Sequence, residues 1–244
     1  MTYCLAIKMN EGLVFAADSR IVAGIDNVTT HRKLYTFRPA TDRFLVLLTS
    51  GNLGTTQELL DLVGRDLDGV GERPSLRTVN YMFEAARYIG QSLIGIEQGY
   101  DAAFRRSGIN GGATLILGGQ IAGRPPELYL IYPEGNYVAA TDETPFLQLG
   151  EFKYGKPILT RVAVPALSLN DAARLALVSF DAAMKSNLAV GPPIELGIYP
   201  RDALQFSHRL TLDAEAPLLR QISADWHTAM LGAFQHLSRF EWEQ

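Results

Sequence analysis

The sequence of 244 residues has only one cysteine, Cys4, and no long apolar run. A single thiol cannot form an internal disulfide, which favours a reducing compartment, although a link between two chains stays open. No apolar stretch approaches the roughly 18 residues that span a bilayer, and the first residues lack the basic region of a signal peptide. We therefore expect a cytoplasmic protein with no membrane partner.

Positive charge is also scarce. The chain has 22 Lys and Arg residues against 26 Asp and Glu residues, a net charge of -4, and no basic cluster longer than Arg105–Arg106. Proteins that grip phosphate backbones need a basic patch, so we expect no nucleic acid partner. The common nucleotide, serine hydrolase and zinc peptidase motifs are missing, and the four histidines lack ligand spacing. We expect neither a metal nor an organic cofactor.

The chain does contain two groups of strand-like segments that alternate with helical ones. Strand patterns cover 3–9, 12–20, 33–37, 44–51, 111–121, 127–140, 146–150, 194–199 and 206–212. Apolar residues at helical spacing predict helices over 59–67, 76–100, 169–184 and 219–237, the third with a capping box from Ser168 to Asp171. Strands that arrive in runs favour an α+β fold of stacked sheets covered by helices. No change in composition marks a linker, so we expect a single domain over 1–244.

The N-terminal strand raises a chemical question, because it begins directly after Met1 at Thr2. If Met1 is removed, Thr2 carries both a hydroxyl nucleophile and a free α-amine that can act as its base. A nearby cation would favour the alkoxide, and a carboxylate would have to hold that cation once it is buried. Asp18 ends the second strand and Lys33 opens the next, while the Gly51 N–H offers a donor for an oxyanion.

Each of these residues also has a simpler explanation. A small second residue is common, Asp18 could belong to a strand-end ion pair with Arg20, and Lys33 could be a solvated strand residue. Gly51 by itself is typical of a turn before a helix. The functional hypothesis depends on their occurring together in this order.

The chain resembles a known family at these residues. Thr2, "AADSR" with Asp18, "KLY" with Lys33 and "TSGNLG" with Gly51 are similar to the proteasome β-subunit type of N-terminal threonine hydrolase. The segment "MTYCLAIKMNEGLVFAADSR" resembles the bacterial Anbu group, or ancestral β subunit, and the resemblance continues through "LGEFKYGKPIL" and "AAMKSNLAVGPPIELGIY".

This resemblance implies a four-layer αββα sandwich that self-associates into a ring or helical stack. It implies Thr2 as nucleophile, Asp18 and Lys33 as its supports, and Gly51 N–H as oxyanion donor. Substrates would be peptides or amides, cleaved without a cofactor; no feature identifies an ATPase partner. The same resemblance places five residues around the side chain that precedes the scissile bond: Ile21, His31, Tyr35, Thr49 and Leu53.

Three positions depart from the proteasome pattern. Asn187 and Val190 stand where active proteasome subunits keep an aspartate and a serine, and Glu151 stands where they carry another serine. Two alternatives to a peptidase or amidase therefore stay open: a structural shell subunit without chemistry, and a peptide-binding chamber that has lost turnover. The presence of Thr2, Asp18 and Lys33 favours the enzyme over the shell subunit.

Overall fold

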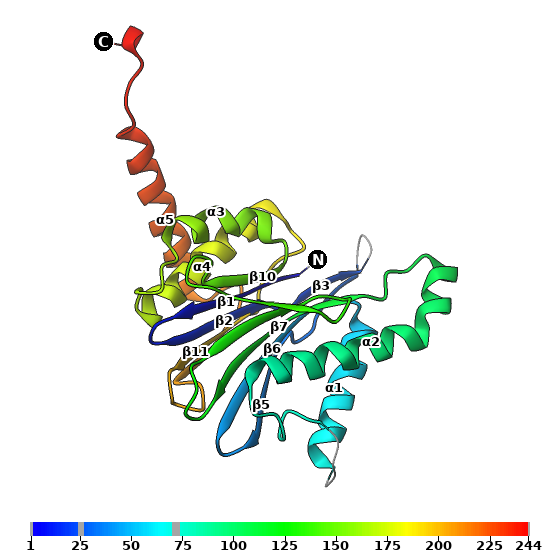
Figure 1. The fold of residues 1–244 in the computed structure, drawn as a ribbon. Helices are drawn as coiled ribbons and strands as arrows, with labels where there is room; N and C mark the ends of the chain where they lie inside the picture. The colour runs from blue at the N-terminus through cyan, green and yellow to red at the C-terminus, as the bar shows by residue number, and fades with distance from the viewer. Residues whose placement is uncertain (1, 24–26, 70–73, 244) are drawn as a thin grey trace.

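The computed structural model describes residues 2–23, 27–69 and 74–243, and its centre is a pair of five-stranded antiparallel sheets (Figure 1). The first sheet has the order β10-β1-β2-β11-β12, with strands Phe146–Gly150, Tyr3–Met9, Gly12–Asp18, Ile194–Pro200 and His208–Leu212. The second sheet follows the order β5-β6-β7-β8-β9, with strands Leu34–Ala40, Arg43–Gly51, Ala113–Ile121, Glu127–Ile131 and Tyr137–Ala139. A separate hairpin joins β3 (Arg20–Ala23) to β4 (Asn27–Thr30).

Helices cover the outer face of each sheet. The second sheet is covered by α1 (Leu53–Asp68) and α2 (Met82–Ser107), and the first by α3 (Phe152–Val162) and α4 (Leu169–Ser186). The chain ends in α5 (Pro217–Gln235) and a short 3₁₀ helix (Glu241–Glu243). The order of layers is αββα, which confirms the predicted fold class.

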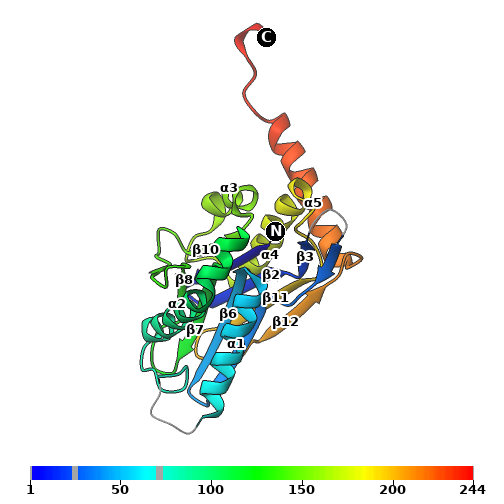
Figure 2. The same ribbon diagram turned by 90° about the vertical axis from the view of Figure 1, so that its right-hand side faces the viewer.

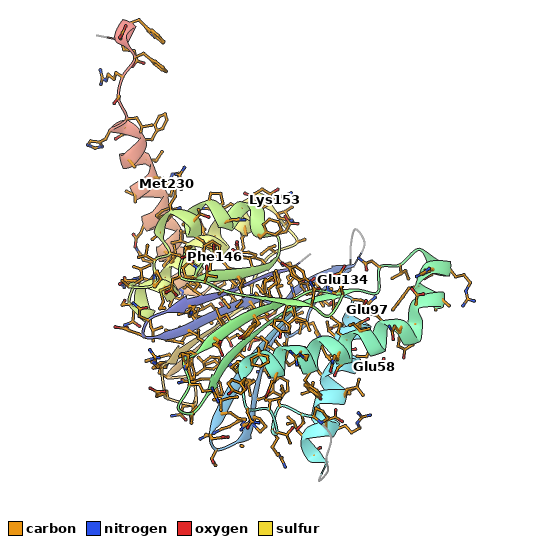
Figure 3. The ribbon with its side chains drawn as sticks, viewed as in Figure 1. Glu58, Glu97, Glu134, Phe146, Lys153 and Met230 are labelled. Atoms are coloured by element: carbon orange, nitrogen blue, oxygen red, sulfur yellow. The ribbon has the colours of Figure 1, made fainter. Side chains whose placement is uncertain are left out.

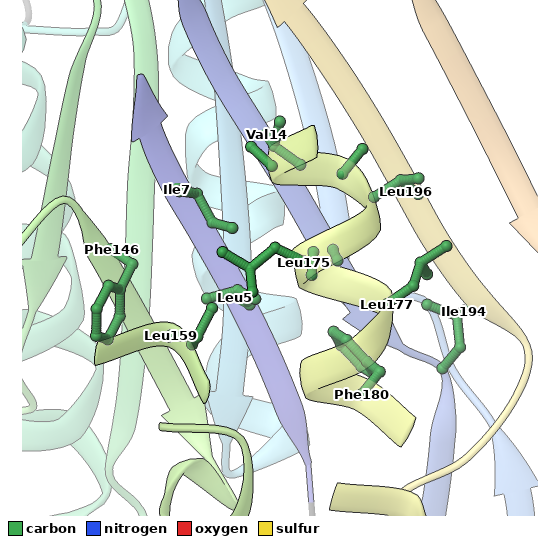
Figure 4. Packing of buried hydrophobic residues seen from close by; sticks show 14 of the residues in the cluster. Leu5, Ile7, Val14, Phe146, Leu159, Leu175, Leu177, Phe180, Ile194 and Leu196 are labelled. Atoms are coloured by element: carbon green, nitrogen blue, oxygen red, sulfur yellow. The ribbon is translucent and has the colours of Figure 1, made fainter. Parts of the chain in front are cut away.

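Three apolar layers hold the four structural layers together. One lies between the first sheet and α4, one between the two sheets, and one between the second sheet and the pair α1 and α2. Alternate residues of β1 pack into the first and second of these apolar layers: Tyr3, Leu5 and Ile7 face the helices, whereas Cys4 and Ala6 face the other sheet. Figure 4 shows Leu5 beside Leu175 of α4. Because both faces are covered, β1 is apolar along nearly its whole length, and its terminus is held in place.

Several boundaries differ from the sequence prediction. Ser168 does cap α4, where its hydroxyl accepts from Asp171 N–H at 3.1 Å, as expected. The helix predicted from residue 76 instead begins at Met82, because the carbonyls of Leu76 and Val79 turn inward to accept from the buried Arg43 guanidinium. The hairpin β3–β4 and the short helix α3, which contains Pro157, were not predicted from periodicity.

The helix α5 behaves unlike the other four helices. It leaves the body and projects away from the sheets in both views, with Met230 well along the projection (Figures 2 and 3). Leu219 and Ile222 in its first turns pack against the core, but no residue of α5 is buried. Large apolar side chains stay exposed along its later part and the tail: Met230, Leu231, Phe234, Leu237, Phe240 and Trp242.

Candidate active site

A buried ion pair lies at the end of the sandwich where the chain begins. Lys33 Nζ is 2.7 Å from Asp18 Oδ1, and the two side chains are 4% and 0% exposed. Lys33 Nζ also donates to the carbonyl of Arg20 at 2.7 Å. The pair forms because β2 ends at Asp18 and β5 begins one residue after Lys33, at the same end of the two sheets. Either charge alone would be costly at such depth, so each requires the other.

The same carboxylate holds the start of the chain. Tyr3 N–H donates to Asp18 Oδ1 at 3.0 Å, one residue after Thr2. On the opposite side of β1, the carbonyl of Thr2 accepts from Glu151 N–H at 2.8 Å. Gly150 adopts φ +76°, and a Cβ there would lie 1.7 Å from the Thr2 carbonyl oxygen, so only glycine permits this approach. The backbone of Thr2 is therefore fixed from both neighbouring strands.

The electrostatics of Asp18 depend on this setting. Burial raises the pKa of Asp18, and the charge and hydrogen bond of Lys33, with backbone hydrogen bonds from Tyr3 and Gly191, oppose the rise only in part. The carboxylate is thus easier to protonate than an ordinary aspartate. Its ability to hold the Lys33 ammonium is sensitive to pH and to any loss of these partners.

The turn after β6 directs a backbone donor toward the same place. Thr49 N–H donates to the Lys33 carbonyl at 3.0 Å, whereas Asn52 N–H donates to the Gly112 carbonyl on the other side of the strand, at 3.0 Å. Because successive N–H groups of a strand alternate in direction, Gly51 N–H points to the Lys33 side, beyond the first residue of β5. The N-terminus of α1 follows at once, and its dipole favours negative charge there.

A cavity of about 180 Å³ collects these groups. Its lining consists of Thr2, Ile21, His31, Lys33, Thr49, Ser50, Gly51, Leu53 and Thr56. Three of the four predicted catalytic residues and four of the five predicted substrate-binding residues thus meet around one space, and Asp18 lies buried directly behind Lys33.

Tyr35 is the exception among the predicted lining residues. Its ring packs into the apolar layer beside α1 and α2, and its hydroxyl donates to the Arg32 carbonyl at 2.7 Å and lies 3.4 Å from His31 Nε2. It therefore supports His31 from outside the cavity. Tyr35 is thus the one predicted substrate-binding residue that the structure does not bring into this cavity.

Two lining residues were not predicted. Ser50 stands between two positions that were, and Thr56 lies in the first turns of α1. A helix that starts two residues after Gly51 presents its fourth residue to the same space, so the start of α1 was the available signal for Thr56. Met1, whose removal the mechanism requires, lies outside the described residues.

Of the three positions that depart from the proteasome pattern, Glu151 contacts Thr2 directly. Glu151 bonds to Thr2 through its backbone, and its side chain lies 4.0 Å from Lys153 Nζ. Asn187 ends α4, and its side chain accepts from Ala189 N–H at 2.9 Å, while Val190 is buried in the core. None of these three side chains lines the cavity.

The described residues contain no group of three or more His, Cys, Asp or Glu side chains placed to hold a metal ion. In the same part of the chain, no helix has both the length and the apolar character needed to cross a bilayer.

Comparisons with known proteins give consistent neighbours. No protein-family model matches the chain, and no curated protein matches it. Among solved structures, an Anbu (Gly-1) mutant from Hyphomicrobium sp. strain MC1 is similar with a TM-score of 0.91 and 41% identity, covering 99% of this chain and 100% of that one. Anbu (ancestral β-subunit) from Yersinia bercovieri gives 0.89 and 38%, covering 98% and 100%. A helical assembly of the Anbu complex from Pseudomonas aeruginosa gives 0.89 and 40%, covering 98% of each chain.

Proposed function

The chain belongs to the Anbu family, the ancestral β-subunit relatives of the proteasome, and on this basis we propose that it hydrolyses peptide or amide bonds through Thr2. The observation that carries the proposal is the buried Lys33–Asp18 pair, which lies behind a cavity shared by Thr2, Lys33 and Gly51. A buried ammonium is costly for a fold, and its position beside a terminal hydroxyl gives it a chemical use.

The proposed reaction uses the chain's own groups only. Removal of Met1 frees the Thr2 amine, which accepts the hydroxyl proton as Oγ attacks the substrate carbonyl. Lys33 stabilises the negative charge on Oγ, and Gly51 N–H stabilises the oxyanion that forms on the carbonyl oxygen. The amine then returns the proton to the leaving nitrogen, and the C–N bond breaks to leave an ester on Thr2. Water attacks this ester in the same way, which releases the acid and restores the hydroxyl.

An intact mass and an active-site label test this proposal. The mass of the purified protein should be that of residues 2–244, and a peptide epoxyketone, which requires both a free amine and its neighbouring hydroxyl, should add once. Thr2→Ala should abolish the adduct and peptide hydrolysis, whereas Thr160→Ala on the exposed face of α3 should change neither. A retained Met1, or an adduct that persists in Thr2→Ala, would refute the mechanism.

Self-association is the second part of the proposal. The Pseudomonas aeruginosa relative forms a helical assembly, and in this chain the apolar side chains on the projecting part of α5 have no covering layer. We expect a homo-oligomer, in a ring or helical stack, measured by sedimentation velocity as a species much heavier than one chain of 26.8 kDa. A strictly monomeric protein would contradict it.

One observation favours a second candidate function, a peptide-binding or shell subunit with little turnover. Val190 is apolar and buried in the core, and Asn187 Oδ1 accepts from Ala189 N–H, so neither position supplies the aspartate or serine of active proteasome subunits. A protein that loses Met1 and binds peptides at the cavity, yet neither takes the label nor releases product, would be this silent form.

A further inference from the structure

The inner part of the cavity has a hydrogen-bonding character that selects among substrate side chains. We propose that it accepts a carboxamide, the side chain of glutamine or asparagine, at the residue before the scissile bond. The proposal rests on the proposed function, because it assigns the side-chain pocket of the same site. This pocket consists of Thr49, Thr56 and His31, with Ile21 and Leu53 at its sides.

Two threonines form the inner wall, where most of their surface is hidden. Thr49 is 5% exposed and lies on the same face of β6 as Leu47, toward α1. Within the described residues its hydroxyl has no hydrogen-bond partner, so it is free to donate and to accept. Thr56 is 4% exposed, and its hydroxyl donates to the Leu53 carbonyl at 2.9 Å. Its proton is therefore used, and toward the pocket its oxygen only accepts.

The tautomer of His31 follows from its neighbour. The Tyr35 hydroxyl has one proton, which it donates to the Arg32 carbonyl, so toward His31 Nε2 at 3.4 Å it can only accept. The hydrogen-bond network thus assigns the proton of neutral His31 to Nε2. The other nitrogen, Nδ1, has no partner among the described residues and carries a lone pair.

These groups match a carboxamide better than its isosteres. A carboxamide offers two N–H donors, for the Thr56 oxygen and the His31 lone pair, and one carbonyl acceptor for the Thr49 hydroxyl. A carboxylate has no donor and would meet two acceptors with like partial charge. An apolar side chain would leave a buried hydroxyl without a partner, which is the situation that produces strong discrimination.

Charge and size agree with this assignment. Lys33 is the one cation whose placement at the cavity is described, and its charge is already neutralised by Asp18 at 2.7 Å, so it adds little attraction for an acidic side chain. The cavity as a whole, including the space beside Thr2 and Gly51, has a volume of about 180 Å³, many times the roughly 15 Å³ needed to admit one water, so a side chain of several atoms can enter it. The side chains of Ile21 and Leu53 can contact the methylene groups of such a chain.

Binding measurements separate this proposal from the proposed function. Acetylated tripeptide amides that differ only in a last residue of Gln, Glu or Met are titrated calorimetrically into Thr2→Ala, which needs no turnover. We expect the Gln peptide to bind on the order of tenfold more tightly than the Met peptide, and more tightly than the Glu peptide. Hydrolysis of the matching substrates by the parent protein is measured in parallel and tests the proposed function alone.

Variants at Thr49 identify the pocket as the cause. Thr49→Val in the Thr2→Ala background removes the hydroxyl with almost no change in shape, and the ratio of Gln to Met affinity should fall toward one. Thr49→Ser keeps the hydroxyl and should keep the ratio. Equal binding of the three peptides, tighter binding of Glu or Met, no detectable binding of any of them, or an unchanged ratio in Thr49→Val would overturn the assignment.

Discussion

Replacing Lys33 by methionine removes the ammonium while keeping a side chain of similar length. Asp18, fully buried, would then keep only its backbone hydrogen bonds, and the Arg20 carbonyl would lose its donor. Breaking a buried pair by removing one partner costs about 3–5 kcal/mol, because an uncompensated charge is left behind. We expect that loss in the free energy of unfolding at neutral pH.

The pH dependence of this loss makes the test sharper. Because this cost falls on the charged form, loss of the Lys33 ammonium raises the pKa of Asp18 further. The folded variant would then bind a proton that the unfolded chain does not, so its stability rises as the pH falls. The difference in free energy of unfolding between the parent protein and Lys33→Met should narrow by up to about 1.4 kcal/mol for each unit by which the pH is lowered, until Asp18 is protonated in the parent as well.

Urea denaturation followed by circular dichroism measures both effects, at one fixed protomer concentration because assembly also stabilises the folded chain. Lys153→Met is the matched control. Its ammonium is 65% exposed and 4.0 Å from Glu151, at the outer surface of α3 (Figure 3), and its loss should change stability by less than about 0.5 kcal/mol. A loss below about 1 kcal/mol in Lys33→Met, or a gap that does not change with pH, would refute the reasoning.

Three further outcomes are expected. Gly51→Ala should destabilise the fold by about 1–3 kcal/mol and lower hydrolysis, because Gly51 has φ +115° and a methyl group there would lie 2.5 Å from the Gly112 carbonyl oxygen. The control Gly64→Ala, in the open middle of α1, should not destabilise the fold. Equal urea midpoints for Gly51→Ala and the parent protein would contradict this prediction. Tyr3→Phe deletes a buried hydroxyl that hydrogen-bonds to Ser179 and Gln148 at 2.6 Å each, and it should lower the free energy of unfolding by about 1–3 kcal/mol. An unchanged urea midpoint would show that these hydrogen bonds do not stabilise the fold. The rate of hydrolysis should fall as the pH is lowered, with a midpoint above about 3.9, the ordinary pKa of aspartate, because burial raises the pKa of Asp18. Protonation of Asp18 favours the folded state, so circular dichroism should still report folded protein at that pH. An activity loss that coincides with unfolding would exclude Asp18 as its cause.

Sequence reasoning succeeded where a pattern has one physical cause. Strands β1, β2 and β6 were predicted because both of their faces are buried, so their residues are apolar almost throughout. The meeting of Thr2 and Asp18 was also predictable, since antiparallel neighbours bring the start of β1 beside the end of β2. Lys33 joins them from the start of β5 in the other sheet, and its approach depends on how the two sheets stack.

Other features depend on contacts that no local pattern encodes. The helix α3 is short, holds Pro157 and has only two buried residues, and it is stabilised by packing on α4. Tyr35 packs against the apolar layer beside α1 and α2, and its hydroxyl donates to the Arg32 carbonyl, contacts that its place in the strand does not encode. The inward-facing carbonyls of Leu76 and Val79 depend on a guanidinium from β6, 33 and 36 residues away in sequence.

The projecting part of α5 has a consequence for how such a chain can evolve. Its side chains contribute no buried surface to the body, while the reactive groups all lie at the opposite end of the chain, in the first 56 residues. Substitutions in the projection therefore leave both the buried core and the cavity unchanged. We expect related chains to vary more in this appendage than in the residues around the cavity.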